Sequence, residues 1–130
     1  MKTIRNILLV EDNKHDQFFF TNALREIPNA KLYYVANNGQ EAMKRLELST
    51  YVPDIIFTDI YMPVMDGLEF VKQLSAVPNA KDVPVVMITT EGSEAHVVQA
   101  LSSGARGYIR KPFTPEQVKE QVIPVLAGKS

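Results

Sequence analysis

Five side chains with the chemistry to hold a phosphoryl group and a magnesium ion lie at the ends of short apolar runs. They are the carboxylates of Glu11, Asp12 and Asp59, the hydroxyl of Thr89 and the ammonium of Lys111. Carboxylate oxygens suit Mg²⁺, which usually shares its coordination shell with a substrate phosphate. A carboxylate can also attack phosphorus and form an aspartyl phosphate. These residue types predict phosphoryl-transfer chemistry, with Asp59 as the nucleophile.

The apolar runs before these residues predict the buried strands of a parallel sheet, separated by helices. The expected strands cover residues 6–10, 31–36, 54–58, 84–89 and 107–110, and the expected helices cover 13–27, 39–48, 66–76, 93–103 and 115–126. Such alternation implies right-handed crossovers with helices on both faces of the sheet. Because ligands bind beyond the carboxyl ends of such strands, the five side chains are expected at one edge.

Local signals mark where several helices begin and where the last one is disturbed. Residues 38–41 and 66–69 resemble capping boxes, and Thr114 precedes a proline at the first helical position, Pro115. Pro124 lacks a backbone donor, so we expect it to kink or end the last helix.

Composition places the chain among ordinary globular domains. Its 130 residues are 45% hydrophobic and 22% charged, with a net charge of -1 and no cysteine. There is no basic footprint for nucleic acid, no disulfide and no thiolate metal site. The apolar runs are too short to span a bilayer, and no signal-peptide pattern precedes the first strand. We expect one cytoplasmic domain over residues 1–130, without an effector domain.

Each of the five residues also has an ordinary structural explanation when taken alone. Asp12 could cap a helix, Thr89 is a common strand residue, and Lys111 before Pro112 could mark only a turn. Their shared position at one predicted edge of the sheet favours a functional site over these separate explanations.

The stretches around these residues resemble the receiver domain of two-component response regulators, most closely the stand-alone chemotaxis type. The matching stretches, in the correct order, are 7–13, 54–67, 84–90 and 107–113, and the resemblance covers essentially the whole chain. It implies an α/β fold, a single doubly wound (βα)5 flavodoxin-like domain with parallel sheet order 2-1-3-4-5.

The resemblance also implies a phosphoacceptor and a metal site. Asp59 would accept the phosphoryl group, and Mg²⁺ would be bound by Asp12, Asp59 and the backbone carbonyl of Tyr61. Glu11 stands where many receivers carry aspartate. Its longer side chain favours a role through a water molecule instead of direct ligation.

A switch is implied by the same resemblance. Thr89 and Lys111 would contact the phosphoryl group, and the bond between Lys111 and Pro112 would be cis. On phosphorylation, the Thr89 hydroxyl would move toward the phosphoryl group and the ring of Tyr108 would turn inward. That change would repack the surface of the fourth helix, fifth strand and fifth helix, where a downstream protein would dock.

The expected function is that of a phosphoacceptor signalling protein, not an enzyme beyond slow self-phosphorylation and dephosphorylation. The phosphodonor would be a phosphohistidine on a histidine kinase or phosphotransfer protein, and the output would be protein–protein contact, with chemotaxis as the specific version. We expect no nucleic acid partner and no membrane insertion, and a monomer or a phosphorylation-dependent dimer. A phosphate sink or relay intermediate without its own output remains an alternative.

Two alternatives come from other functional classes. A flavodoxin-type cofactor binder needs a phosphate loop rich in glycine and hydroxyl residues after the first strand, where this chain has Glu11 and Asp12. A magnesium-dependent phosphatase with an aspartyl intermediate usually carries its nucleophile after the first strand, with a second acid two residues later. Here the presumed nucleophile, Asp59, follows the third strand, and Tyr61 stands two residues later.

Two details leave alternatives open. Tyr61 and Glu91 occupy positions that tune dephosphorylation in the receiver family, and their expected effects on the attacking water oppose each other. In the triplet 18–20, Phe18 points nearly opposite to a helical stripe that contains Asp16 and Phe19. Phe18 is then either an isolated surface aromatic or a contact for the phosphodonor.

Overall fold

Five parallel strands form the centre of the chain in the computed structural model, which describes residues 4–28, 30–48, 52–78, 80–90 and 94–126. The strands are β1 (Ile4–Val10), β2 (Ala30–Ala36), β3 (Ile55–Asp59), β4 (Val85–Thr89) and β5 (Gly107–Arg110). Their order in the sheet is β2-β1-β3-β4-β5, and every neighbouring pair is parallel. The predicted fold class and strand order are confirmed.

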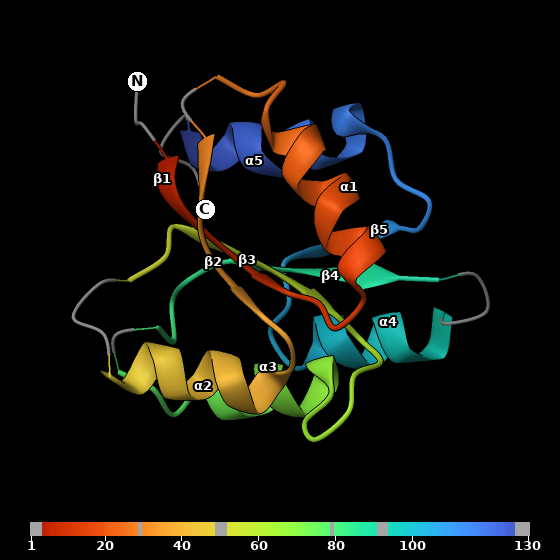
Figure 1. The fold of residues 1–130 in the computed structure, drawn as a ribbon. Coiled ribbons are helices and arrows are strands. Elements are labelled where there is room, and N and C mark those ends of the chain that lie inside the picture. Colours follow the sequence, from red (N-terminus) through yellow and green to blue (C-terminus); the bar gives the residue numbers. More distant parts are fainter. Residues whose placement is uncertain (1–3, 29, 49–51, 79, 91–93, 127–130) are drawn as a thin grey trace.

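Helices cover both faces of this sheet (Figure 1). They are α1 (Lys14–Leu24), α2 (Gly39–Leu48), α3 (Gly67–Leu74), α4 (Glu94–Ser102) and α5 (Pro115–Leu126). On one face, α1 and α5 pack through Phe20, Val118 and Val122. On the other face, α2, α3 and α4 pack through residues such as Leu46 and Phe70.

The alternation of side chains along β1 explains why both faces need cover. Ile7 and Leu9 belong to the core beneath α1 and α5, whereas Leu8 and Val10 belong to the core above α2 and α3. Successive side chains of a strand point to opposite faces of the sheet. An apolar run is therefore buried on both sides, as the sequence predicts for these strands.

The predicted helix starts are confirmed by hydrogen bonds at the caps. The Glu41 N–H donates to Asn38 Oδ1 at 2.9 Å, and the Glu69 N–H donates to Asp66 Oδ1 at 2.9 Å. At α5 the pairing is reciprocal, because the backbone N–H of each residue donates to the other's side chain: Thr114 to Gln117 Oε1 at 2.8 Å, and Gln117 to Thr114 Oγ1 at 3.3 Å. Each cap satisfies backbone donors that have no partner within the helix.

Several predicted boundaries differ from the structure by one to three residues, and the ends of two helices have a clear physical reason. The first helix was expected to reach residue 27, but α1 ends at Leu24. The next residues form tighter bonds to the third residue back, such as Ile27 N–H to the Leu24 carbonyl at 3.0 Å, as at many helix ends. Pro124 does not end α5, which continues to Leu126. It lies in the last turn, so only a short stretch of helix follows the missing donor.

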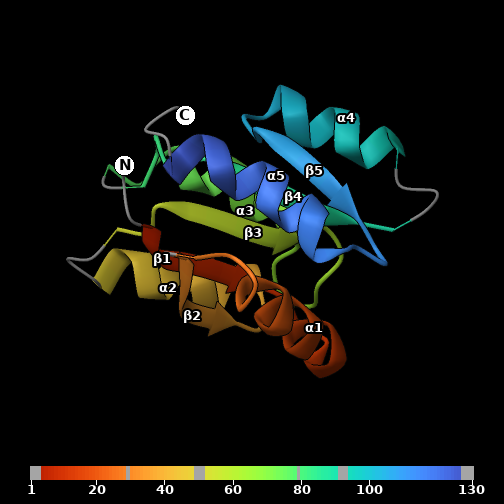
Figure 2. The ribbon, with the colours of Figure 1, turned by 90° about the horizontal axis from the view of Figure 1, so that it is seen from above.

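The carboxyl ends of the strands share one edge of the sheet, since the arrowheads in Figure 2 point to the same side of the molecule. Along the described part of the chain, no helix has the length and apolar character needed to cross a membrane.

Candidate functional site at the carboxyl edge of the sheet

Three predicted acids meet where β1 and β3 end side by side. The two strands are paired in register, with Val10 opposite Thr58, so the residues that follow them are neighbours. Glu11, Asp12 and Asp59 each offer a carboxylate oxygen, and these atoms all lie within 4.8 Å of one another. Glu11 and Asp59 are buried, whereas Asp12 is exposed. The cluster therefore has an open side through which an ion or a phosphoryl group can enter.

The ammonium of Lys111 reaches this cluster from the loop after β5. Its Nζ lies 2.9 Å from Glu11 Oε1 and 3.2 Å from Asp59 Oδ2. The contact with Glu11 is a close ion pair and not a well-directed hydrogen bond. The peptide bond between Lys111 and Pro112 is cis, as the family resemblance implied.

The electrostatics of the cluster follow from burial and from like charge. Burial and the neighbouring Asp59 carboxylate raise the pKa of Glu11 from its ordinary 4.5 to about 8, against the opposing effect of Lys111. For Lys111, burial lowers the pKa, but the carboxylates of Asp16, Glu11 and Asp59 outweigh it and the net shift is upward. Like charges that share a buried site favour a bound cation.

Asp59 is held in place from two directions. Its Oδ1 accepts a hydrogen bond from the backbone N–H of Ile60 at 2.8 Å, and its Oδ2 faces Lys111. Behind it, the Gly67 N–H donates to the Ile60 carbonyl at 2.8 Å, and a Cβ at position 67 would overlap the Asp59 carbonyl oxygen. Only glycine allows α3 to begin this close to the end of β3.

Thr89 lies at the same edge, at the end of β4. The backbone N–H of Lys111 donates to the Thr89 carbonyl at 2.7 Å, which ties the ends of β4 and β5 together. The Thr89 hydroxyl is buried and donates to the Thr90 carbonyl at 3.2 Å. The backbone of Thr89 is thus at the predicted edge, while its hydroxyl bonds to the backbone of the next residue, Thr90.

Tyr61 and Tyr108 both present exposed rings near this edge. Tyr61 is 49% exposed, its hydroxyl pairs with His96 Nδ1 on α4 at 2.5 Å, and the two rings meet edge to face. Tyr108 lies on β5, an edge strand, and is 45% exposed. Glu91 lies outside the described residues.

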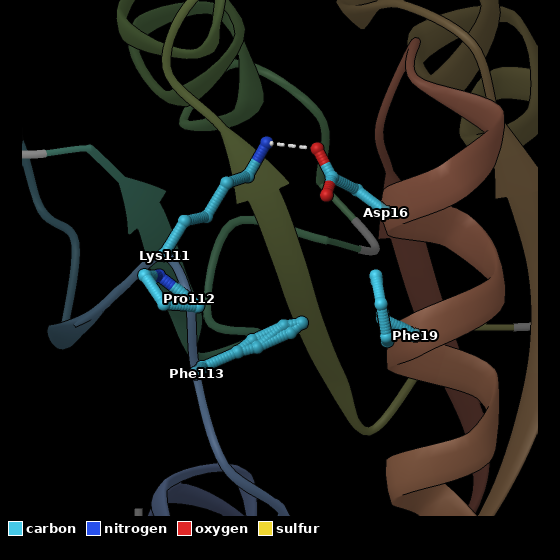
Figure 3. A pocket seen from close by; sticks show the side chains of 5 residues that line it. All are labelled: Asp16, Phe19, Lys111, Pro112 and Phe113. Atoms are coloured by element: carbon cyan, nitrogen blue, oxygen red, sulfur yellow. Dashed lines mark hydrogen bonds and ion pairs between the residues drawn. The ribbon is translucent and has the colours of Figure 1, made fainter.

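One further acid contacts the site and was not among the predicted site residues. Asp16, on the first turn of α1, places its Oδ2 2.8 Å from Lys111 Nζ (Figure 3). The sequence contained one signal for it, since Asp16 is the acid on the helical stripe with Phe20 and Ala23, both of which are buried. Its position 95 residues before Lys111 conceals the pairing.

The loop between β3 and α3 contains a strained residue. Val64 has φ of 69°, in the left-handed region, and its side chain is exposed. A β-branched residue is rare in that region, because its Cβ crowds the backbone. The strain lies between Asp59 and the start of α3, beside the residues that form the site.

Residues 7–123 match the response regulator receiver domain family, and the chain belongs to that family. Among curated proteins, it is 37% identical over 120 residues to the chemotaxis protein CheY1 of Helicobacter pylori, covering 92% of this chain and 95% of that protein.

Solved structures agree with this assignment. The chemotaxis response regulator CheY4 of Vibrio cholerae superimposes with a TM-score of 0.81 at 31% identity, over 95% of this chain and 100% of the other. The receiver domain of a sensor histidine kinase from Pseudomonas aeruginosa, solved with a magnesium ion coordinated in its active-site cleft, gives 0.79 at 28% identity, over 96% and 98%. Family membership favours the receiver over the flavodoxin-type and phosphatase alternatives.

Proposed function

We propose that this receiver accepts a phosphoryl group from a phosphohistidine onto Asp59 and signals through contacts that depend on phosphorylation. The observation that carries the proposal is the meeting of Asp59 with two further carboxylates and one ammonium at the carboxyl edge. In the transfer, a carboxylate oxygen of Asp59 attacks phosphorus, the bond from phosphorus to the imidazole nitrogen breaks, and the imidazole leaves with the bonding electrons.

The residues around Asp59 fit a magnesium ion. Their donor atoms are carboxylate oxygens, which suit Mg²⁺. Because like charges are buried close together here, a bound cation would stabilise them. Asp12 and Asp59 would bind the ion directly together with the carbonyl of Tyr61, and Glu11 would act through a water. When bound, Mg²⁺ neutralises charge on the phosphoryl oxygens.

The side chains then divide the remaining work. Lys111 would neutralise a phosphoryl oxygen, and the Thr89 hydroxyl would donate to another once it leaves the Thr90 carbonyl. In the receiver family this last movement is followed by an inward turn of the aromatic residue on β5, here Tyr108. The ring of Tyr108 is 45% exposed, so it lies outside the core before any such turn.

The proposed output surface is the face formed by α4, β5 and α5. It carries exposed apolar side chains, namely Val98, Leu101, Tyr108 and Ile123. A downstream protein that docks here would sense the position of Tyr108. The proposal includes control of a flagellar motor or similar chemotaxis target, the cytoplasm as the location, and a monomer or a phosphorylation-dependent dimer.

The proposed donor surface is the opposite side of the edge, around α1. Phe18 is 63% exposed, as the helical pattern predicted. If the phosphodonor docks on α1, Phe18→Ala weakens binding of a cognate phosphotransfer domain, whereas unchanged binding identifies Phe18 as an isolated surface aromatic.

Intact-mass analysis after incubation with acetyl phosphate and Mg²⁺ tests the central proposal. The wild-type protein is expected to gain one phosphoryl mass, and Asp59→Asn is expected to gain none. Asp82→Asn, which changes an exposed acid between α3 and β4, serves as the matched control and should behave like the wild type. Equal labelling of the wild type and Asp59→Asn would refute the assignment of Asp59.

A further inference from the structure

The ammonium of Lys111 is shared among three carboxylates, and an ammonium has three protons to donate. Its Nζ lies 2.8 Å from Asp16, 2.9 Å from Glu11 and 3.2 Å from Asp59. One proton is available for each neighbour. The ammonium donates hydrogen bonds to Asp16 and Asp59 and forms an ion pair with Glu11, so a phosphoryl oxygen that arrives at Asp59 must compete with these carboxylates for Lys111.

The three acids differ in how easily they can release Lys111. The side chains of Glu11 and Asp59 are 1% and 9% exposed, whereas that of Asp16 is 30% exposed. A buried carboxylate that loses its partner bears the cost of desolvation, but a partly exposed one regains water. Asp16 is the partner that can be given up most cheaply.

The backbone of Asp16 is fixed by the N-cap of α1, and its side chain reaches Lys111 across the edge of the sheet. Its N–H donates to Asn13 Oδ1, the N-cap of α1, at 3.0 Å. Figure 3 shows the Lys111 side chain extended from the β5 side toward α1, where it meets Asp16 above the rings of Phe19 and Phe113. A cavity of about 270 Å³ is lined by Asp16, Phe19, Lys111 and Phe113, together with Pro112. The ion pair bridges α1 and the loop after β5 beside the phosphoacceptor.

We propose that Asp16 is a positioning residue that restrains Lys111 and slows phosphorylation of Asp59. In the unphosphorylated protein, Asp16 makes the shortest of the three contacts to the ammonium, at 2.8 Å against 3.2 Å for Asp59, and so competes for it. Phosphoryl transfer requires Lys111 to exchange the Asp16 carboxylate for a phosphoryl oxygen. This inference rests on the proposed function, because it concerns how the same site is regulated.

The test compares phosphorylation rates of the wild type, Asp16→Asn and Asp16→Glu with acetyl phosphate and Mg²⁺. Asp16→Asn is expected to react about three- to fivefold faster, because a partly exposed ion pair of this kind is modest in strength. Asp16→Glu, which keeps the carboxylate, is expected to stay close to the wild type. A merely structural role for Asp16 would lower the rate instead of raising it.

Binding of beryllofluoride in the presence of Mg²⁺, measured by calorimetry, supplies a readout without group transfer. Because this phosphoryl mimic also needs Lys111, Asp16→Asn is expected to tighten binding by about the same factor. Glu26→Gln removes an equal charge from an exposed position beyond α1 and is the matched control. It is expected to change neither the rate nor the affinity.

A comparison of two donors separates restraint of Lys111 from simple repulsion of an anion. Phosphoramidate carries less negative charge than acetyl phosphate at neutral pH, so release of repulsion would accelerate acetyl phosphate much more. Equal acceleration with both donors supports the restraint. Acceleration confined to acetyl phosphate, or unchanged rates in Asp16→Asn, overturns it while leaving the role of Asp59 intact. Absence of phosphorylation in the wild type overturns both.

Discussion

The two sides of the carboxyl edge are built differently. On the side of β1, α1 and β3, charged groups form a dense cluster, here called the acidic side: Glu11, Asp12, Asp16, Asp59 and Lys111. On the side of α4 and β5 lie Tyr61, Thr89, His96 and Tyr108, here called the aromatic side. Its side-chain contacts include one hydroxyl-to-imidazole hydrogen bond and one hydroxyl on a neighbouring carbonyl.

This contrast separates two requirements of a phosphorylation switch. On the acidic side the charged groups are in place before the reaction, and the one rearrangement we propose there is the release of Lys111 from Asp16. The aromatic side has exposed rings, and its contacts are individually weak. Under the proposed function, phosphorylation would bias an existing equilibrium on the aromatic side, while on the acidic side it would exchange one partner of Lys111.

The largest effect is expected when the acidic side loses its cation. Lys111→Met keeps much of the side-chain volume but leaves three carboxylates without their shared ammonium. We expect a loss of about 2–3 kcal/mol in the free energy of unfolding without metal, measured by urea denaturation. Mg²⁺ should restore more stability in this variant than in the wild type.

Lys72→Met removes an exposed lysine from α3 and controls for the change in net charge. It is expected to change stability by less than about 0.5 kcal/mol. Equal effects of the two substitutions would show that the acidic side is not held by Lys111.

The next effect concerns the pH dependence of the acidic side. The pKa of Glu11 in the folded protein, about 8, lies above its ordinary value of 4.5, so the folded state binds this proton more tightly. Stability without metal should therefore fall as pH rises from about 5 to 8, by about 2 kcal/mol. Thermal unfolding across this range measures it. Glu11→Gln should flatten the curve, and the same slope in both proteins would exclude Glu11 as its source.

A smaller gain is expected in the loop that separates the two sides. Val64 has φ of 69°, and asparagine tolerates this conformation better than a β-branched residue. Val64→Asn should stabilise the fold by about 1 kcal/mol in chemical denaturation. Val64→Ala removes the branch but keeps the Cβ, so its gain should be smaller. A loss of stability in Val64→Asn would contradict the assignment of strain.

The smallest effect is expected on the aromatic side. Tyr61→Phe removes the hydroxyl that pairs with His96 Nδ1 but keeps the ring contact. We expect a loss of about 0.5–1 kcal/mol, measured by thermal denaturation. Tyr108→Phe, at an exposed ring on β5, is the control and should change stability less. A loss of stability in Tyr61→Phe as large as that in Lys111→Met would contradict the difference between the acidic and aromatic sides.

Much of the fold was predictable because each element carries a local signal. The strand at 107–110 and the helices at 39–48 and 115–126 have the expected bounds, since glycine, asparagine and threonine–proline patterns mark their ends. The convergence of Glu11, Asp12 and Asp59 followed from parallel strands that share one edge.

What sequence reasoning missed depends on side chains that meet across the fold. The pairing of Asp16 with Lys111 joins residues that are 95 positions apart, and nothing near either residue encodes it. The hydrogen bond between Tyr61 and His96 likewise depends on how the loop after β3 faces α4. Periodicity places a residue on a helical face, but it does not identify the atom that the residue meets.

The close approach of Gly67 to the end of β3 limits how far the sequence of the loop from Ile60 to Asp66 can be changed. Its base is closed by the hydrogen bond between Gly67 and Ile60, and the space for a side chain at position 67 is occupied by the Asp59 backbone. Insertions or exchanged sequences are therefore best tolerated at the apex near Val64. An engineer who grafts a foreign loop here can vary its tip while keeping glycine at its closing position.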